Sequence, residues 1–385
     1  MPRQDHTTHF IREAAVDELV ASGHAGLTME SLARRSFSSI GSVYSRFPNR
    51  IAAMLEVFES CIVPATENPP RCPGENVYGW ALTQPEVMRH LRALVEISLC
   101  SRFEPALAPA GEHLLSVVSS QREDHSDVDG LDWLVGAVLV GHIVLTGAGC
   151  SIPDMVEDLQ VLLECASPPG EPQVPTVNGL DAPIPPSPSP RSDDAVASRL
   201  VSATTEELAA TGASRANVRR IASRSGVTTG AVYRRYDSKT DLVRDALVRE
   251  LQPSRYSWTK KLVDAVTGAD TATSPGDVLA DQVFTLLNDR TRMLATLEMI
   301  HAARSDDAVR RTLVRQVEEA ASARARLFAS VPREAGSTPA ISPVLMGWVI
   351  QMAPTGARVL VALGDEPDEN RVRAALRRVT AAALQ

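Results

Sequence analysis

The chain has 385 residues, of which 44% are hydrophobic and 4% aromatic. This length suits two to four domains, and the apolar content is high enough for packed cores, which excludes a disordered chain. The low aromatic content favours helices over a β-sandwich. The formal charge of −8 excludes a protein that is basic over its whole surface.

The N-terminal residues MPRQDHTTHFIREAA lack the apolar run of a signal peptide. The longest apolar stretch, residues 133–149, contains a histidine and four glycines and is shorter than the ~20 residues that span a bilayer. We therefore expect a cytoplasmic protein without a membrane partner. Five cysteines fall in the first half without a close pair, which predicts reduced thiols, with redox sensing as the alternative. They are Cys61, Cys72, Cys100, Cys150 and Cys165.

The first predicted domain covers residues 1–58 and is called the first head below. Residues 32–50, LARRSFSSIGSVYSRFPNR, predict two short helices joined by a turn, and residues 28–50 carry a net charge of +3. Phe37 stands at the turn position, where φ > 0 costs a bulky residue about 1–2 kcal/mol. We expect either that the turn is remodelled or that Phe37 packs elsewhere. The DNA-facing candidates are Ser39, Ser42, Tyr44, Ser45, Arg46 and Arg50.

Residues 59–166 are expected to form a helical regulatory domain, with bundle helices at 131–146 and 153–165. The next segment, 167–190, contains nine prolines and almost no charge. Because proline lacks an amide donor and fixes φ, neither helix nor sheet persists in such a sequence. We interpret it as a linker that reaches ~70 Å when extended at about 3.1 Å per residue.

The second head is predicted at residues 191–250. Residues 215–239 hold seven basic side chains against one aspartate, a net charge of +6. A short helix is expected to end at Gly226, where glycine suits a left-handed turn, and Thr228 and Ser238 are expected to cap the next two helices. Two short helices joined by a tight turn form a helix-turn-helix, whose second helix enters the major groove.

In the second head, Thr229 and Arg234 are predicted to meet base edges, whereas Tyr233, Arg235 and Lys239 are predicted to hold phosphates. The small side chains on the same helix allow it to lie deep in the groove. The complete set of DNA-facing candidates is Thr228, Thr229, Gly230, Ala231, Tyr233, Arg234, Arg235 and Lys239.

The two heads share a pattern in which every matched pair of residues is separated by the same distance along the chain. Gly23 matches Gly212, Val43-Tyr44 matches Val232-Tyr233, and Arg46 matches Arg235. So many matches at one spacing indicate an internal duplication. The exposed positions differ between the copies, which predicts that each head binds a different half-site.

Residues 221–242, IASRSGVTTGAVYRRYDSKTDL, resemble the TetR family of bacterial transcription regulators. The family pattern runs IA-x-x-A-G-V-S-x-G-x-x-Y-x-x-F-x-S-K-x-x-L. Only Ser225, Thr228 and Tyr236 are mild substitutions. The first head departs from the pattern at Phe37, Ser38 and Arg50. The resemblance covers the head of each half, and the rest of each half agrees only in length and helical character.

The resemblance implies an all-α fold of two units, each with a three-helix DNA-binding domain and a C-terminal helical ligand-binding and dimerisation domain. We expect the two units to form a pseudo-dimer within one chain, with a higher oligomer left open. The second regulatory domain would cover residues 251–385, with bundle helices at 341–361 and 367–384. The partners implied are a double-stranded DNA operator of asymmetric sequence and an unidentified small-molecule effector of a repressor.

The apolar helices offer candidates for the effector pocket, with core packing as the alternative for each. These candidates are Trp133, His142, Trp348, Gln351 and Met352. Pro354 is expected to kink or break the helix at 341–361 and to mark a cavity edge.

We find no phosphate loop, no HExxH motif, no nucleophile elbow and no pair of metal ligands at a suitable spacing. The sequence therefore predicts no enzyme, no cofactor and no metal. The competing function is a protein-interaction module that keeps the fold with weakened or lost DNA binding in one or both heads.

Overall fold

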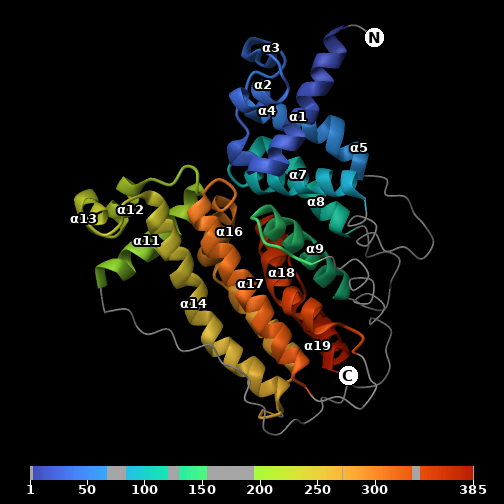
Figure 1. Ribbon diagram of the computed structural model, residues 1–385, viewed down its shortest axis with the longest axis vertical. Helices are drawn as coiled ribbons and strands as arrows, with labels where there is room; N and C mark the ends of the chain where they lie inside the picture. The colour runs from blue at the N-terminus through green and yellow to red at the C-terminus, as the bar shows by residue number, and fades with distance from the viewer. Residues whose placement is uncertain are drawn as a thin grey trace, which may run out of the picture.

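The computed structural model describes residues 3–66, 84–119, 130–153, 195–270, 272–331 and 339–384, and every regular element within them is a helix (Figure 1). The predicted all-α fold is confirmed. The predicted linker 167–190 and all but the first residue of the predicted helix 153–165 lie outside the described residues. The described cysteines, Cys61, Cys100 and Cys150, are free thiols.

Four helices and a short extension build the first head, and each short helix begins at a side-chain cap. Thr28, Ser39 and Asn49 each accept a hydrogen bond from a backbone amide in the first turn, which satisfies a donor that the helix leaves open. The elements are α1 (Arg3–Gly26), α2 (Met29–Arg35), α3 (Ile40–Tyr44), α4 (Arg50–Val57), the π-helical turn η1 (Phe58–Ile62) and α5 (Val63–Thr66).

The second head repeats this order. Its caps are Asn217, Thr228 and Ser238, so both caps predicted from the sequence are confirmed. The last of its helices extends from the head into the body of the protein. The elements are α11 (Ala195–Thr211), α12 (Val218–Arg224), α13 (Thr229–Tyr233) and α14 (Lys239–Val266).

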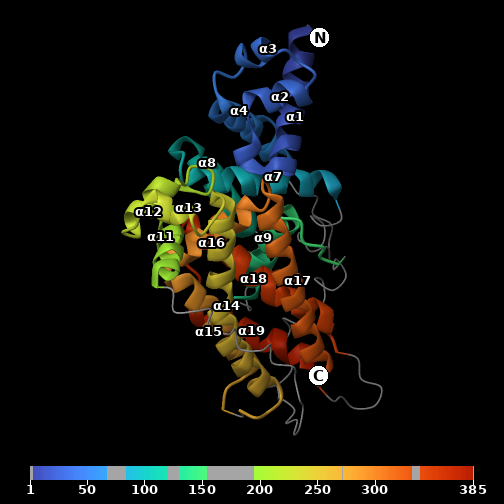
Figure 2. The same ribbon diagram turned by 60° about the vertical axis from the view of Figure 1, so that its left-hand side comes forward.

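The remaining helices pack into the body that carries both heads (Figures 1 and 2). The helices predicted at 131–146, 341–361 and 367–384 appear as α9, α18 and α19. The bounds are α7 (Pro85–Ser101), the 3-10 turn η2 (Pro105–Leu107), α8 (Ala108–Ser119), α9 (Leu131–Gly147), α15 (Pro275–Asn288), α16 (Arg290–Ala302), α17 (Asp307–Ala329), α18 (Pro343–Ala362) and α19 (Glu369–Leu384).

Helix α18 is long and apolar enough to span a membrane, but 83% of that stretch is buried inside the protein. Its apolar side chains therefore serve the core. Pro354 lies inside this helix, which continues past it to Ala362. The expectation that Pro354 breaks the helix is wrong, because the neighbouring helices hold the segment on every side.

Helices α9 and α18 pack closely because a glycine from each faces the backbone of the other. A Cβ atom at Gly141 would lie 1.9 Å from the carbonyl oxygen of Met352, and one at Gly356 would lie 1.9 Å from that of Ala137. Only glycine permits so close an approach. Gly141 precedes Gly356 in the sequence by the same number of positions as Ala137 precedes Met352. Each half therefore makes the same glycine contact with the equivalent residue of the other half.

Two buried ion pairs join α7 and the residue after it to α16 and the turn after it. In these pairs each half again supplies the same residue to the other half. Glu96 lies 3.1 Å from the Arg304 guanidinium, and Glu298 lies 3.0 Å from that of Arg102. The spacing in the sequence between the two glutamates equals that between the two arginines. All four side chains are at most 9% exposed. Burial alone would raise the pKa of Glu96, but Arg304, His301 and His24 hold it well below its usual range.

Each of these glutamates also holds the head of its own half. Glu96 accepts a hydrogen bond of 3.0 Å from the backbone amide of His24, and Glu298 accepts one of 3.0 Å from the backbone amide of Ala213. His24 and Ala213 are equivalent positions of the two heads and follow the glycines that end the straight part of α1 and of α11. Each head is therefore fastened to the junction between the halves at an equivalent point.

Candidate nucleic-acid interface

In the second head, Gly226 makes the turn between α12 and α13. Its φ is 68°, a left-handed conformation that glycine adopts without a steric cost. The amide of the next residue, Val227, donates to the carbonyl of Ala222 at 3.0 Å and closes the turn. Val232 faces inward and is buried, whereas Tyr233 is 52% exposed. The local pattern thus buries one side of α13 and presents the other.

The predicted base-reading and phosphate-binding side chains of α13 lie on this presented side. Gly230, Arg234 and Arg235 are exposed, while Thr229 and Ala231 are half-buried. Thr228 is exposed but accepts a hydrogen bond of 3.2 Å from the amide of Ala231, so its hydroxyl serves as the helix cap. Exposed arginines beside a short helix with small residues are suited to a DNA groove and its phosphates.

Lys239 makes contacts within the second head. Its ammonium donates to the carbonyls of Ala213 and Ala216, at 3.0 and 3.5 Å, and the side chain is half-buried. These carbonyls belong to the loop between α11 and α12. Lys239 therefore ties the start of α14 to that loop, a contact between distant residues that the motif alone does not reveal.

Three arginines of the +6 segment are held by carboxylates. Glu207 is fully buried and lies 2.5 Å from Arg220 and 3.5 Å from Arg224, while Arg215 pairs with Glu104. These ion pairs therefore join α11 to α12 and join the second head to the body. Sequence reasoning missed Glu207, although a lone acid on the apolar side of an amphipathic helix signals a buried charge that needs a partner.

In the first head, the turn keeps the same geometry despite Phe37. The φ of Phe37 is 52°, and the amide of Ser38 donates to the carbonyl of Ala33 at 2.9 Å, as the equivalent groups do around Gly226. The side chain of Phe37 is 98% exposed. Both expectations for Phe37 are therefore wrong: the turn is not remodelled, and the ring does not pack. The strained backbone is held by the flanking caps and hydrogen bonds.

Five of the six DNA-facing candidates of the first head lie on or beside α3, and the sixth, Arg50, begins α4. Tyr44 is 49% exposed, close to the value of its counterpart Tyr233. Ser39 caps α3, and Arg46 donates to the Ser42 hydroxyl and carbonyl at 2.8 Å each. Ser45 is exposed and donates to the carbonyl of Ser42 at 2.9 Å. This head thus presents hydroxyls with one internally bonded arginine.

Glu104, between α7 and η2, contacts both heads. It pairs with Arg215 of the second head and lies 4.0 Å from Arg50 of the first. Figures 1 and 2 show the two heads as separate projections of the same body, with α3 and α13 at its periphery. Neither of the two short helices is covered, since Tyr44 and Tyr233 are both about half-exposed.

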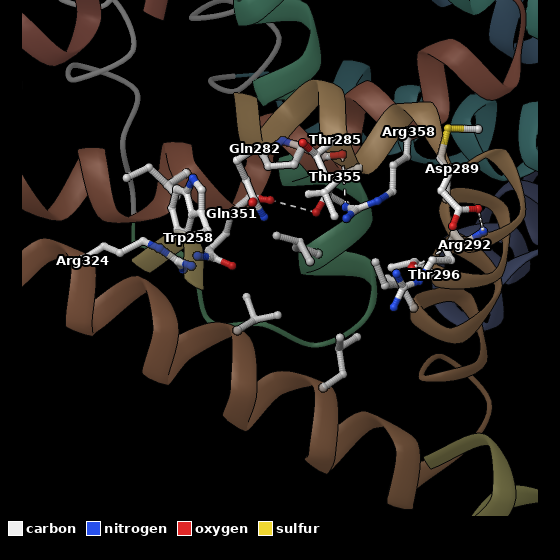
Figure 3. A pocket seen from close by; sticks show the side chains of 18 residues that line it. Trp258, Gln282, Thr285, Asp289, Arg292, Thr296, Arg324, Gln351, Thr355 and Arg358 are labelled. Carbon is white, nitrogen blue, oxygen red and sulfur yellow. Dashed lines mark hydrogen bonds between the residues drawn. The ribbon is translucent and has the colours of Figure 1, made fainter. Parts of the chain in front are cut away.

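A cavity lies in the second half, lined by α14 to α18 and by Leu145 of α9 (Figure 3). Three arginines, Arg292, Arg324 and Arg358, line it, and the Arg324 guanidinium lies 4.7 Å from the ring centroid of Trp258. Sequence reasoning missed these arginines. The signal was present for Arg358, because a charged residue within an apolar helix is unusual.

Of the five pocket candidates, only Gln351 lines this cavity, and Pro354 lines it as well. Trp133 is buried and donates to the carboxylate of Asp365 at 2.8 Å, and Trp348 and Met352 are buried in α18. His142 is half-buried in α9. Trp133, Trp348 and Met352 belong to the hydrophobic core.

Comparison with known proteins agrees with the geometry of the second head. Residues 200–246 match the family model described as bacterial regulatory proteins, tetR family. No curated protein matches the chain. The matched residues include α12, α13 and the first turns of α14, which are the elements that present Arg234 and Arg235. The match and the exposed Arg234 and Arg235 at the end of α13 together support a DNA-binding transcription regulator of the TetR family.

Proposed function

We propose that this protein is a cytoplasmic transcriptional repressor whose single chain binds an asymmetric operator through two non-identical heads. The reciprocal ion pairs carry this proposal. Glu96 with Arg304 and Glu298 with Arg102 exchange partners between the halves, which is the contact pattern of a two-fold interface. A chain that supplies both sides of such an interface forms a pseudo-dimer by itself.

The exposed positions of the two heads support an asymmetric operator. Ser45 occupies the place that corresponds to Arg234, and Ser42 the place that corresponds to Ala231. Arginine donates to guanine edges in the major groove, whereas a serine hydroxyl accepts or donates with several bases. The two half-sites would therefore differ in sequence, and the second would contribute more of the specificity.

The arginine-lined cavity supports a ligand response. Three guanidiniums and the Trp258 ring form a lining suited to a molecule with an anionic group and an apolar or aromatic part. The cavity contacts α14, which continues into the second head, and α18, which packs on the first half. A ligand that prefers one arrangement of these helices would change the spacing of the heads.

The test is selection of randomised duplexes by the full-length protein, followed by footprinting of the selected site. We expect two unlike half-sites protected by one chain. A selected palindrome bound by two chains would refute the asymmetric operator while leaving DNA binding intact. Affinity for the selected duplex should fall steeply with salt, with a log–log slope near −0.9 for each phosphate contact.

The surface of the first head supports an alternative function for this head, in which it contacts a protein partner instead of DNA. Phe37 is 98% exposed and the neighbouring Ile40 is 44% exposed, which gives this head an apolar tip. An apolar surface of this kind is typical of protein interaction sites. Replacement of Ser42, Ser45 and Arg46 by alanine distinguishes the two. Unchanged DNA affinity and an unchanged footprint would favour the alternative for the first head.

A further inference from the structure

Ile40 is an exposed apolar residue on α3, the helix of the first head that corresponds to α13. It is the first residue of α3 and is 44% exposed. Tyr44, four positions later, is 49% exposed, and residues four apart lie on the same face of a helix. Val43 is buried and faces the core. Ile40 and Tyr44 therefore form the presented face of α3, although the DNA-facing candidates taken from the sequence do not include Ile40.

The polar side chains on and beside α3 already have hydrogen-bond partners within the head. The Ser39 hydroxyl accepts from the amide of Ser42 at 3.1 Å. The Ser42 hydroxyl accepts from Arg46 at 2.8 Å, and the Ser45 hydroxyl donates to the carbonyl of Ser42 at 2.9 Å. Arg46 also donates to the Thr8 hydroxyl at 3.0 Å. The atoms of α3 that remain available to a base are therefore largely the carbons of its presented face.

We propose that Ile40 reads thymine in the first half-site by packing its side chain against the C5-methyl group in the major groove. This inference rests on the proposed binding of an operator by both heads. The C5-methyl of thymine is the apolar group that base pairs present in the major groove, and apolar side chains recognise it. With Arg234 reading guanine in the second half-site, the two half-sites would differ in base composition.

The place of Ile40 in the fold is that of a residue that reads bases. It is equivalent to Thr229, because each directly follows the hydroxyl cap of its helix, Ser39 or Thr228. The helix-turn-helix that contains Thr229 lies within the match to the tetR family model. After Ile40 comes Gly41, where an added Cβ atom would meet nothing within 4 Å. The space beside Ile40 is thus open to a base pair.

The charge of the first head suits a duplex as the partner of this face. Residues 28–50, which include α2 and α3, carry a net charge of +3. Arg34 is exposed and Arg50 is partly exposed, so positive side chains accompany the apolar face on the same small head. Such side chains attract phosphates whatever the base sequence. Ile40 would then select among the bases that the bound head can reach.

The test compares thymine with uracil in the duplex that the full-length protein selects. Uracil pairs with adenine as thymine does and lacks only the C5-methyl group. The second half-site is identified as the one whose base preference changes in Arg234→Ala, so the other belongs to the first head. Deoxyuridine in place of the thymine that faces Ile40 should lower the affinity about fourfold, the effect of about one buried CH₂ group.

Two variants assign the methyl contact to one residue. Ile40→Ser removes the apolar side chain at an exposed position, where substitutions are well tolerated. This variant should bind the thymine and uracil duplexes with equal affinity. Phe37→Gly is the matched control, because it removes an exposed ring from the preceding turn and leaves α3 unchanged. It should keep the thymine preference of the wild type.

The outcomes separate this inference from the proposed function. Equal affinity of the wild type for both duplexes would overturn the role of Ile40 and leave the operator intact. A first half-site without a selected thymine would do the same, as would a preference that Ile40→Ser keeps and Phe37→Gly loses. A footprint with no first half-site, as expected if this head contacts a protein, would overturn both the inference and the two-headed operator. Failure to select any duplex would refute DNA binding itself.

Discussion

The two heads have the same order of helices and the same turn but differ in how they join the body. In the first head, Leu32 and Val43 belong to the hydrophobic core that extends through the whole protein. In the second head, the equivalent Ile221 and Val232 belong to a small core of their own. The second head thus has a small core of its own, and it is tied to the body by α14, by apolar residues of α11 such as Val201 and Leu208, and by polar contacts such as that of Glu298 with Ala213.

The comparison also shows which features a helix-turn-helix requires. Both turns keep the same backbone hydrogen bond, both second helices start at a hydroxyl cap, and both tyrosines are about half-exposed. The turn residue and the exposed side chains differ. Backbone hydrogen bonds and caps maintain the motif, so the turn tolerates Phe37 and the presented surface is free to diverge.

The largest expected effect is on the buried ion pairs that both halves share. Glu96→Ala and Glu298→Ala should each lower the free energy of unfolding by about 3–5 kcal/mol, because each leaves an arginine buried without its carboxylate. Denaturant unfolding measures this. If one variant lost less than about 1 kcal/mol while the other lost several, the two junctions would not be equivalent in energy.

The next effect concerns matched positions of the two short helices. Arg234→Ala should cost about 1–3 kcal/mol of discrimination at one base pair, because a guanidinium that reads a guanine edge is removed. Ser45→Ala, at the equivalent position of the first head, should cost less. Binding to the selected duplex and to single-base variants checks this. Equal losses on every duplex from Arg234→Ala would contradict its role in reading bases.

A smaller effect is expected from exchanging the turn residues. Gly226→Phe should destabilise the second head by about 1–2 kcal/mol, because a side chain is forced into the left-handed region. Phe37→Gly should stabilise the first head by about 1 kcal/mol, since the exposed ring buries no surface. Amide hydrogen exchange in each head resolves the two changes. Destabilisation by Phe37→Gly would mean that the ring has a contact that stabilises the turn.

The smallest effect separates Lys239 from Arg235. Lys239→Ala should lower the stability of the second head by about 0.5–1.5 kcal/mol, because its ammonium binds two loop carbonyls, and should leave the salt dependence of DNA binding unchanged. Arg235→Ala should lower the log–log salt slope by about 1. A reduced salt slope for Lys239→Ala would restore its predicted contact with a phosphate.

The sequence predicted the features that depend on local pattern. The all-α fold, the late apolar helices and the caps at Thr228 and Ser238 follow from periodicity and from residues within one or two turns. The placement of Tyr233 and Arg234 on the presented side of α13 follows in the same way. These parts need no knowledge of the tertiary structure.

The sequence could not predict contacts between residues that the fold alone brings together. The spacing between equivalent residues is larger in α7 and α16 than in the heads, and larger again in α9 and α18, so a comparison at one spacing finds only the heads. The exposed Phe37, the loop contacts of Lys239 and the cluster around Glu96 depend on packing. Each required atomic positions.

The central claim is that one polypeptide holds two unlike DNA-binding heads on a single duplex. The most direct measurement is the mass of the complex formed on the duplex selected from a random pool, together with the sequence of that duplex. We predict one chain for each duplex and two half-sites that are not inverted copies of each other. Two chains on an inverted repeat would contradict the account.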